Sequence, residues 1–267
     1  MTESTKNNFD CFNLPPVEYS GLVLVCCQNR RNELRTLLNN VIPEELSQKL
    51  AVIIIGSDGK EERHPQSKTE LVILYQNTED DLQKKIKLAL SQLGDPTLLI
   101  EDFKNISEGT LSFYNNDPKT IYPDRILNSI LVWGDVSIYT KARIKVLLEM
   151  TEDSNQGKRI REEIKKQLSA HRQTTKTGRF RNQVVFDNTY QYYFESDNPK
   201  EWRHGFKMGP LRAVQRRLDL LTIEAFKKGK LTLDEIESLP TNTVERIDFF
   251  VTHGLIDKDF AQKLIEA

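Results

Sequence analysis

Two aliphatic runs dominate the hydrophobic pattern of the N-terminal half. Leu50–Ile55 is a continuous aliphatic run that stops at a glycine, and Glu70–Tyr75 has the same character after its first residue. Short uninterrupted aliphatic runs are typical of strands covered on both faces. We therefore predict two buried strands with a polar, turn-rich segment between them. Pro96–Phe103 predicts a third strand, and Thr110–Tyr114 predicts a short fourth strand.

Helical periodicity surrounds these strands. Apolar residues recur at helical spacing from Gly21 to Asn40, although Gly21–Cys27 taken alone is also compatible with a strand. Leu82–Leu93 again has the helical period. Strands that alternate with helices indicate an α/β domain with a mixed sheet. We place this domain at residues 21–125, after a flexible lead-in of residues 1–20.

The C-terminal half has mainly helical signals, which predict an all-helical domain at residues 126–267. Thr232 with Glu235 forms a capping-box pattern, and Asn242 is a second candidate N-cap. One stretch, Thr174–Trp202, lacks helical periodicity, and either a hairpin or a long ordered loop fits it. The predicted long helical stretches are Asp124–Met150, Gly157–Ala170 and Pro210–Lys228.

Composition narrows the class of protein. Hydrophobic residues make up 38% and charged residues 29% of the 267 residues, as in soluble globular proteins. A formal net charge of -1 gives no global reason to expect nucleic acid as a partner. The apolar runs are too short to cross a bilayer, and the polar N-terminus lacks a signal-peptide stretch, so no membrane association is expected. Cys11, Cys26 and Cys27 are odd in number and crowded, which favours buried thiols and a reducing, cytoplasmic location.

The segment between the two buried strands has the chemistry of an anion site. Gly56 permits a phosphate to approach the backbone, and the Ser57 hydroxyl and neighbouring N–H groups can donate hydrogen bonds to it. Residues 58–64 are predicted to begin a helix, whose N-terminus would add positive potential. A plain strand–turn–strand connection is the alternative interpretation.

This segment resembles the signature of the polymerase-β-like nucleotidyltransferase superfamily, in which a buried strand ends in Gly-Gly or Gly-Ser. Within the superfamily it is most similar to PII-uridylyltransferase-like signalling nucleotidyltransferases. Asp124–Asp135 and Phe206–Arg212 resemble two later segments of the same proteins, so the similarity spans about residues 50–220. The matching positions of the loop are Gly56, Ser57, Gly59, Lys60 (where Arg is usual), Glu62 and Ser67.

The resemblance implies a magnesium site with one important departure. In this family two acids one residue apart on the second strand hold Mg²⁺ ions that bridge the nucleotide phosphates, and a neighbouring strand supplies a third acid. Here those two positions are Lys68 and Glu70, and a lysine cannot ligate Mg²⁺. One hypothesis is that Lys68 takes the place of the metal and contacts phosphate directly. Glu101 and Asp102 are candidates for the third acid, and Asp102 is assigned with Glu70 as a metal ligand.

The function implied by the resemblance is binding of a nucleoside triphosphate (NTP). If the protein is active, it transfers a nucleotide monophosphate to a hydroxyl, with a protein side chain as the acceptor by analogy. Glu70 and Lys68 are then the candidate catalytic residues, and Lys60, Lys207 and Arg212 are candidate phosphate contacts beside Gly56 and Ser57. The alternative is a catalytically inactive module that binds a nucleotide or a partner protein.

Basic stretches leave a third class open, an RNA-binding or tRNA-modifying enzyme. Lys158–Arg181 holds nine Lys and Arg residues against two Glu. Arg212 and Arg216 lie one helical turn apart and share a face, which either points to a triphosphate or is solvated.

Overall fold

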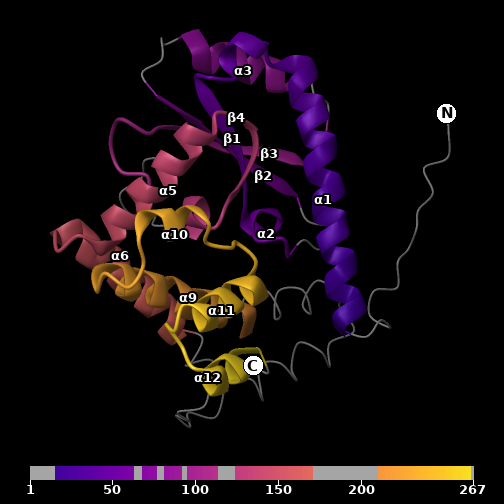
Figure 1. Ribbon diagram of the computed structural model, residues 1–267. Coiled ribbons are helices and arrows are strands. Elements are labelled where there is room, and N and C mark those ends of the chain that lie inside the picture. Colours follow the sequence, from indigo (N-terminus) through magenta and orange to yellow (C-terminus); the bar gives the residue numbers. More distant parts are fainter. Residues whose placement is uncertain are drawn as a thin grey trace.

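The computed structural model describes residues 16–62, 68–76, 81–91, 95–113, 124–170 and 210–265 (Figure 1). A four-stranded mixed sheet lies at its centre, in the order β3-β2-β1-β4. Strand β1 pairs antiparallel with both β2 and β4, and β2 pairs parallel with β3. The strands are β1 (Leu50–Ile55), β2 (Thr69–Tyr75), β3 (Leu98–Asn105) and β4 (Ile130–Gly134).

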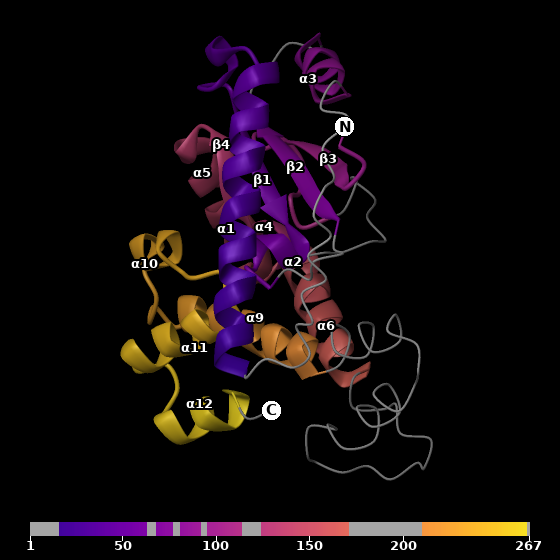
Figure 2. The same ribbon diagram turned by 90° about the vertical axis from the view of Figure 1, so that its right-hand side faces the viewer.

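Hydrophobic cores cover both faces of the sheet, which explains why β1 is apolar at every position. Alternate residues of β1 enter different cores, so all six are buried. One core includes Leu50 and Val52 with Leu34 and Leu38 of α1 (Pro16–Val41), and with residues of α3 (Asp81–Ser91). Figures 1 and 2 show α1 running along this side of the sheet.

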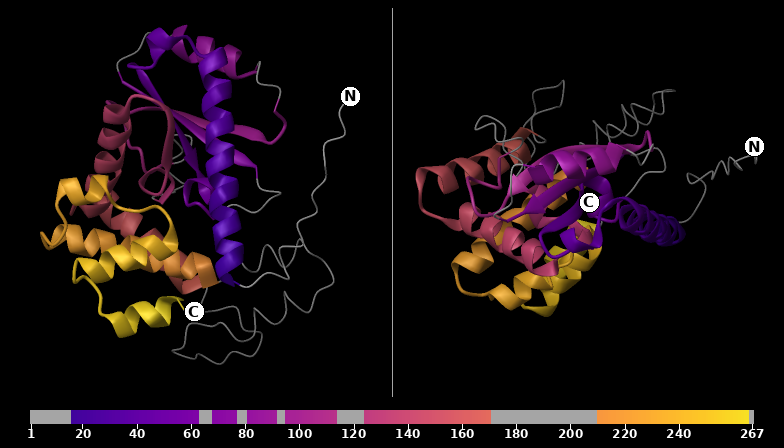
Figure 3. Two further views of the ribbon diagram at one scale, coloured as in Figure 1. Left: turned by 45° about the vertical axis from the view of Figure 1, so that its right-hand side comes forward. Right: turned by 90° about the horizontal axis from the view of Figure 1, so that it is seen from above.

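The second core joins the sheet to the C-terminal helices. Ala51 and Ile53 of β1 belong to the same cluster as Val146 of α5 (Val136–Thr151), Leu218 of α9 (Pro210–Lys227) and Phe250 of α11 (Thr243–Thr252). Helices α9 and α11 lie at the end of the sheet where β1 leads into α2 (Gly56–Gly59), whereas α5 packs against β1 and β2, as Figures 1 and 3 show. The helices on this side are α4 (Asp124–Leu127), α5 (Val136–Thr151), α6 (Asn155–Ala170), α9 (Pro210–Lys227), α10 (Leu233–Glu237), α11 (Thr243–Thr252) and α12 (Lys258–Ile265). A short 3-10 helix, η2 (Glu44–Leu46), precedes β1.

Local signals read from the sequence account for several helix boundaries. The capping box of α10 is formed by Thr232 and Glu235, and Asn242 caps α11 by accepting from the N–H groups of Val244 and Glu245. The strands predicted at Leu50–Ile55, Glu70–Tyr75 and Pro96–Phe103 are present as β1, β2 and β3. Across the described ranges, every helix is too short or too polar to cross a membrane.

Four local predictions were wrong. Ile130–Gly134, expected within a helix, is strand β4, because this apolar stretch completes the free edge of β1. Residues 110–113 form a turn with a single bridge residue at Phe113 and no strand. Helix α1 begins at Pro16, so the predicted lead-in does not extend to residue 20. Cys26 is exposed, whereas Cys27 is buried as expected. The stretch Thr174–Trp202 lies outside the described residues.

Candidate functional site

The Gly-Ser loop is a tight turn at the end of β1. Gly56 has φ +70, in the left-handed region that favours glycine, and a Cβ there would lie 2.6 Å from Oε2 of Glu70. The carboxylate of Glu70 therefore lies directly against the loop. Gly56–Gly59 form a single helical turn, so the helix predicted for residues 58–64 does not continue through Glu62.

Buried contacts fix this turn against the start of β2 and against helix α1. The buried carboxylate of Asp58 accepts a hydrogen bond from the Thr69 hydroxyl at 2.7 Å. Arg30 of α1 donates to the same hydroxyl oxygen at 3.1 Å. A Cβ at Gly59 would lie 2.6 Å from the carbonyl oxygen of Ile54, so this position also requires glycine. The loop is thus held in place from two sides.

Arg125 joins acids from two neighbouring strands beside the loop. Its Nη1 atom lies 3.8 Å from Oε2 of Glu70 on β2 and 3.4 Å from Oε2 of Glu101 on β3. The parallel register passes from Leu71–Ile100 to Val72–Asp102, which leaves Glu101 as an extra residue in β3. This irregularity allows Glu101 to share the guanidinium with Glu70.

The electrostatics of this cluster favour keeping Glu101 protonated to a higher pH than usual. Burial raises the pKa of Glu101, the guanidinium of Arg125 opposes the rise, and the carboxylate of Glu70 adds to it. One cation between two carboxylates leaves an excess of negative charge, which protonation of Glu101 removes.

Asp102 has a different environment from the one assigned to it. Its carboxylate lies 3.1 Å from the ammonium of Lys104 and accepts a hydrogen bond from the backbone N–H of Phe103. The structure therefore brings Glu101, and not Asp102, into the shared contact with Glu70. Because Glu101 and Asp102 are adjacent in the sequence, the sequence alone could not predict which of them the irregular register places beside Glu70.

The donor set does not fit a two-metal site. The carboxylates of Glu70 and Glu101 already share the guanidinium of Arg125, and Lys68 supplies no oxygen donor for Mg²⁺. Lys68, just before β2, is exposed, and among the described residues no ion pair joins it to Glu70. Groups of three or more metal-ligating acids, histidines or cysteines do not occur within the described ranges.

Of the basic residues predicted to contact phosphate, the structure describes the side chain of Lys60 but not those of Lys207 and Arg212. Lys60 is buried, and its ammonium donates to Oε1 of Gln215 on α9 at 2.8 Å, so it points into the helices. Lys207 lies outside the described residues. Arg212 lies in the first turn of α9, and its side chain is also outside them. Arg216, expected on an open basic face, is completely buried.

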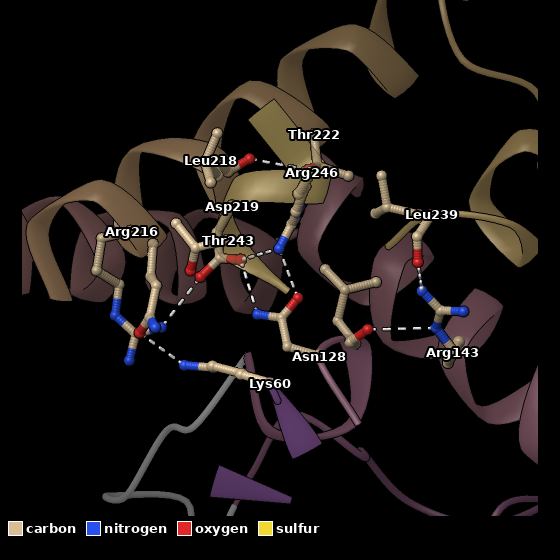
Figure 4. A network of polar contacts seen from close by, with 12 residues as sticks. Lys60, Asn128, Arg143, Arg216, Leu218, Asp219, Thr222, Leu239, Thr243 and Arg246 are labelled. Carbon is tan, nitrogen blue, oxygen red and sulfur yellow. Dashed lines mark hydrogen bonds and ion pairs between the residues drawn. The ribbon is translucent and has the colours of Figure 1, made fainter. Parts of the chain in front are cut away.

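Arg216 belongs to a buried polar network that the sequence did not predict (Figure 4). Asp219 accepts ion-pair contacts from Arg216 at 3.0 Å and Arg246 at 3.1 Å, and a hydrogen bond from Asn128 at 3.0 Å. Arg246 also donates to Thr222 at 2.5 Å. The available signal was an acid one turn from an arginine on the apolar face of α9, a pattern that indicates a paired, buried charge.

Glu62, which follows the Gly-Ser loop, contacts the start of α11. It accepts hydrogen bonds from the hydroxyl and the N–H of Thr243, the first residue of α11, and from Gln215 at 2.5 Å. Burial raises the pKa of Glu62, while Lys60 and the hydrogen bonds from Thr243 oppose the rise. Residues that follow the Gly-Ser turn therefore anchor the C-terminal helices.

The basic stretch proposed for RNA is only partly described. Within α6, Lys165 lies 3.0 Å from Glu162 and Lys166 lies 3.8 Å from Glu163, so these cations have acidic neighbours on the helix surface. Residues 171–181 lie outside the described residues.

Comparison of the sequence with known protein families and with curated proteins finds no match. The residues around the Gly-Ser loop therefore carry the functional argument.

Proposed function

We propose that this protein is a nucleotidyltransferase-like module that binds an NTP at the Gly56-Ser57 loop and transfers nucleotide slowly or not at all. The observation that carries the proposal is the position of Arg125. It lies between Glu70 and Glu101, and Glu70 lies directly against Gly56. In the family that the sequence resembles, acids at such positions hold magnesium.

A guanidinium supports binding without supporting transfer. Its planar donors form charge-assisted hydrogen bonds with phosphate oxygens and need no metal for this. A metal ion generates a strong nucleophile by coordinating the attacking oxygen directly, and a guanidinium cannot do this. Arg125 thus favours a bound, unreacted triphosphate.

The other groups at this loop agree with an anionic ligand. Gly56 and Ser57 are half-buried at the end of β1, and Lys68 is exposed at the start of the neighbouring strand β2. The guanidinium of Arg125 offsets part of the negative charge of Glu70 and Glu101 that would repel a phosphate. By analogy with the family, Lys207 and Arg212 would be outer phosphate contacts, and a protein side chain would be the acceptor of any residual transfer.

Gly56→Asp is expected to abolish NTP binding, whereas Gly229→Asp is expected to leave it unchanged. Both glycines have similar left-handed backbones, with φ +70 and φ +66. At Gly56 the new side chain meets Glu70 and adds a third carboxylate, whereas a Cβ at Gly229 meets nothing within 4 Å. Each charge-assisted phosphate contact is worth about 1.5–3 kcal/mol, so losing one weakens binding more than about tenfold. Calorimetry with ATP and UTP measures the affinities.

The same titrations in Mg²⁺ and in EDTA test the role of Arg125. We expect similar affinities in Mg²⁺ and in EDTA, because the cation beside Glu70 and Glu101 is the side chain of Arg125. We also expect little release of pyrophosphate. Equal affinities for folded wild type and Gly56→Asp would rule out this loop as the binding site. Rapid release of pyrophosphate that requires Mg²⁺ would show that the protein is an active, metal-dependent transferase.

Lys68→Asp is expected to make NTP binding depend on Mg²⁺. Residues 68 and 70 are two apart along one strand direction, so the new carboxylate and Glu70 would face the same side. We expect Mg²⁺ to tighten binding about tenfold in this variant, a change of about 1.4 kcal/mol. Lys49→Asp is the matched control, because Lys49 is also exposed and directly precedes a strand, β1. Its position is at the opposite end of the sheet, since Leu50 pairs with Tyr75. An equal response to Mg²⁺ in both variants would contradict a metal position at residues 68 and 70.

A further inference from the structure

A groove of about 1080 Å³ follows the outer edge of β3. Its lining comes from residues 100–105 of β3, from residues 108–110 and Phe113 and from the first turns of α6, together with Tyr75 and Lys87. Glu101 also lines it, so the groove begins beside the Arg125 cluster. The volume lies just above the usual range for small-molecule sites, which is about 300–1,000 Å³.

Charged residues with little exposure hold one wall of the groove in place. Glu149 of α5 is buried and accepts hydrogen bonds from the N–H groups of Leu111 and Ser112 at 2.9 and 3.0 Å. The buried ammonium of Lys104 donates to the carbonyl oxygen of Phe113. Gln156 of α6 donates to the Thr110 hydroxyl at 2.6 Å. Burying charged side chains is costly unless their partners are in place, so this wall has a defined shape.

The edge of β3 is poorly suited to pairing with a strand of another protein. The register of β3 is irregular at Glu101, and the N–H of Phe103 already donates to the carboxylate of Asp102. Irregular registers and charged side chains at sheet edges are devices that prevent strand addition. The shape of the groove is therefore more suited to a small molecule than to an extended peptide.

Aromatic rings and cations supply the recognition chemistry. The ammonium of Lys87 lies 5.0 Å from the centre of the Phe103 ring, and the guanidinium of Arg159 lies 5.4 Å from that of Phe113. Planar heteroaromatic groups stack on such surfaces. Two of the lining carboxylates, Glu101 and Asp102, have cationic partners, so a phosphate at the rim need not meet unbalanced negative charge from them.

We propose that this groove is a second ligand site, which binds a nucleoside monophosphate or a compound of the same size and chemistry. Its ring packs beside Phe103, whose side chain is half-buried, and its phosphate is held by Arg159 or Lys87. The site uses none of the backbone of the Gly-Ser loop, so its occupation does not require a ligand at Gly56.

Calorimetry with AMP, adenosine and inorganic phosphate tests this site. Wild type should bind AMP more tightly than either adenosine or phosphate. Arg159→Gln and Lys87→Gln should each weaken AMP binding, one of them by about fivefold or more, because they remove an ionic contact to phosphate. Both side chains are exposed, so folding should be preserved.

Matched variants separate the groove from other basic surfaces and from the Gly-Ser loop. Lys158→Gln on α6 and Lys84→Gln on α3 remove exposed charges that do not line the groove, and they should leave AMP affinity unchanged. Gly56→Asp should also bind AMP normally. The proposal is overturned if wild type fails to bind AMP at millimolar concentration. Loss of AMP binding in Gly56→Asp, with Arg159→Gln and Lys87→Gln unaffected, would overturn it as well, since the ligand would then be at the loop.

Discussion

Replacing Asp219 by alanine is expected to destabilise the protein by about 3–5 kcal/mol, because it removes the carboxylate that two buried guanidinium groups share. Asp219 is 1% exposed, and its ion-pair partners Arg216 and Arg246 are 0% and 2% exposed. Asp219 also accepts from Asn128, which directly follows α4. The variant would therefore loosen the attachment of α9 and α11 to the sheet, at the end where the Gly-Ser loop lies.

Asp153→Ala provides the control for this experiment. Asp153 also contacts two cations, Lys227 at 2.6 Å and Arg161 at 3.4 Å, but its side chain is 77% exposed. Exposed ion pairs contribute little, because water solvates the separated charges well. Urea unfolding followed by circular dichroism should show a large loss for Asp219→Ala and little change for Asp153→Ala. Similar losses in both variants would show that the buried network does not stabilise the fold as inferred.

Gly134→Ala is expected to destabilise the protein by about 3–5 kcal/mol, by combining backbone strain with overpacking. Gly134 ends β4 with φ +96, and a Cβ there would lie 2.1 Å from the carbonyl oxygen of Leu50. That carbonyl also accepts a hydrogen bond from Asp135, the N-cap of α5, at 2.9 Å. Neither backbone segment can move without disturbing the pairing of β4 with β1 or the start of α5.

Gly254→Ala separates strain from overpacking. Gly254 also has a left-handed backbone, with φ +62, but a Cβ there would meet nothing within 4 Å. The Gly254→Ala variant should therefore lose only the stability that backbone strain costs, about 1–2 kcal/mol. Thermal and urea unfolding of the two variants give the comparison. If Gly134→Ala were no less stable than Gly254→Ala, the close approach of β4 and Leu50 would not constrain the fold.

The two proposed sites lie at different strands of the same sheet. The Gly-Ser loop uses the end of β1, and the groove uses the outer edge of β3, with Glu101 beside both. Arg125 holds Glu101 from the side of the loop. Substitutions of Arg125 would affect both sites at once, which is why the tests proposed above use residues that belong to one site only.

The sequence by itself determined those features that depend on neighbouring residues. Continuous aliphatic character predicted β1 and β2, because a strand covered on both faces has no polar side. The glycine at the end of β1 predicted a turn that only a residue without a Cβ adopts easily, and its φ of +70 agrees. Capping residues predicted the start of α10 and α11, since a cap and the N–H groups that it accepts from are within three residues of each other.

The tertiary structure decided everything that depends on residues far apart in the chain. Ile130–Gly134 is a strand because β1 offers an unpaired edge, although its own pattern is also compatible with a helix. Arg216 is buried because Asp219 and the elements around it complete its environment, and the spacing of arginines along α9 does not contain that information. Glu101 rather than Asp102 joins Glu70 because the register of β3 against β2 is irregular at that point. Arg125, more than fifty positions beyond Glu70 in the sequence, reaches the candidate site only because the fold brings its side chain to Glu70 of β2 and Glu101 of β3.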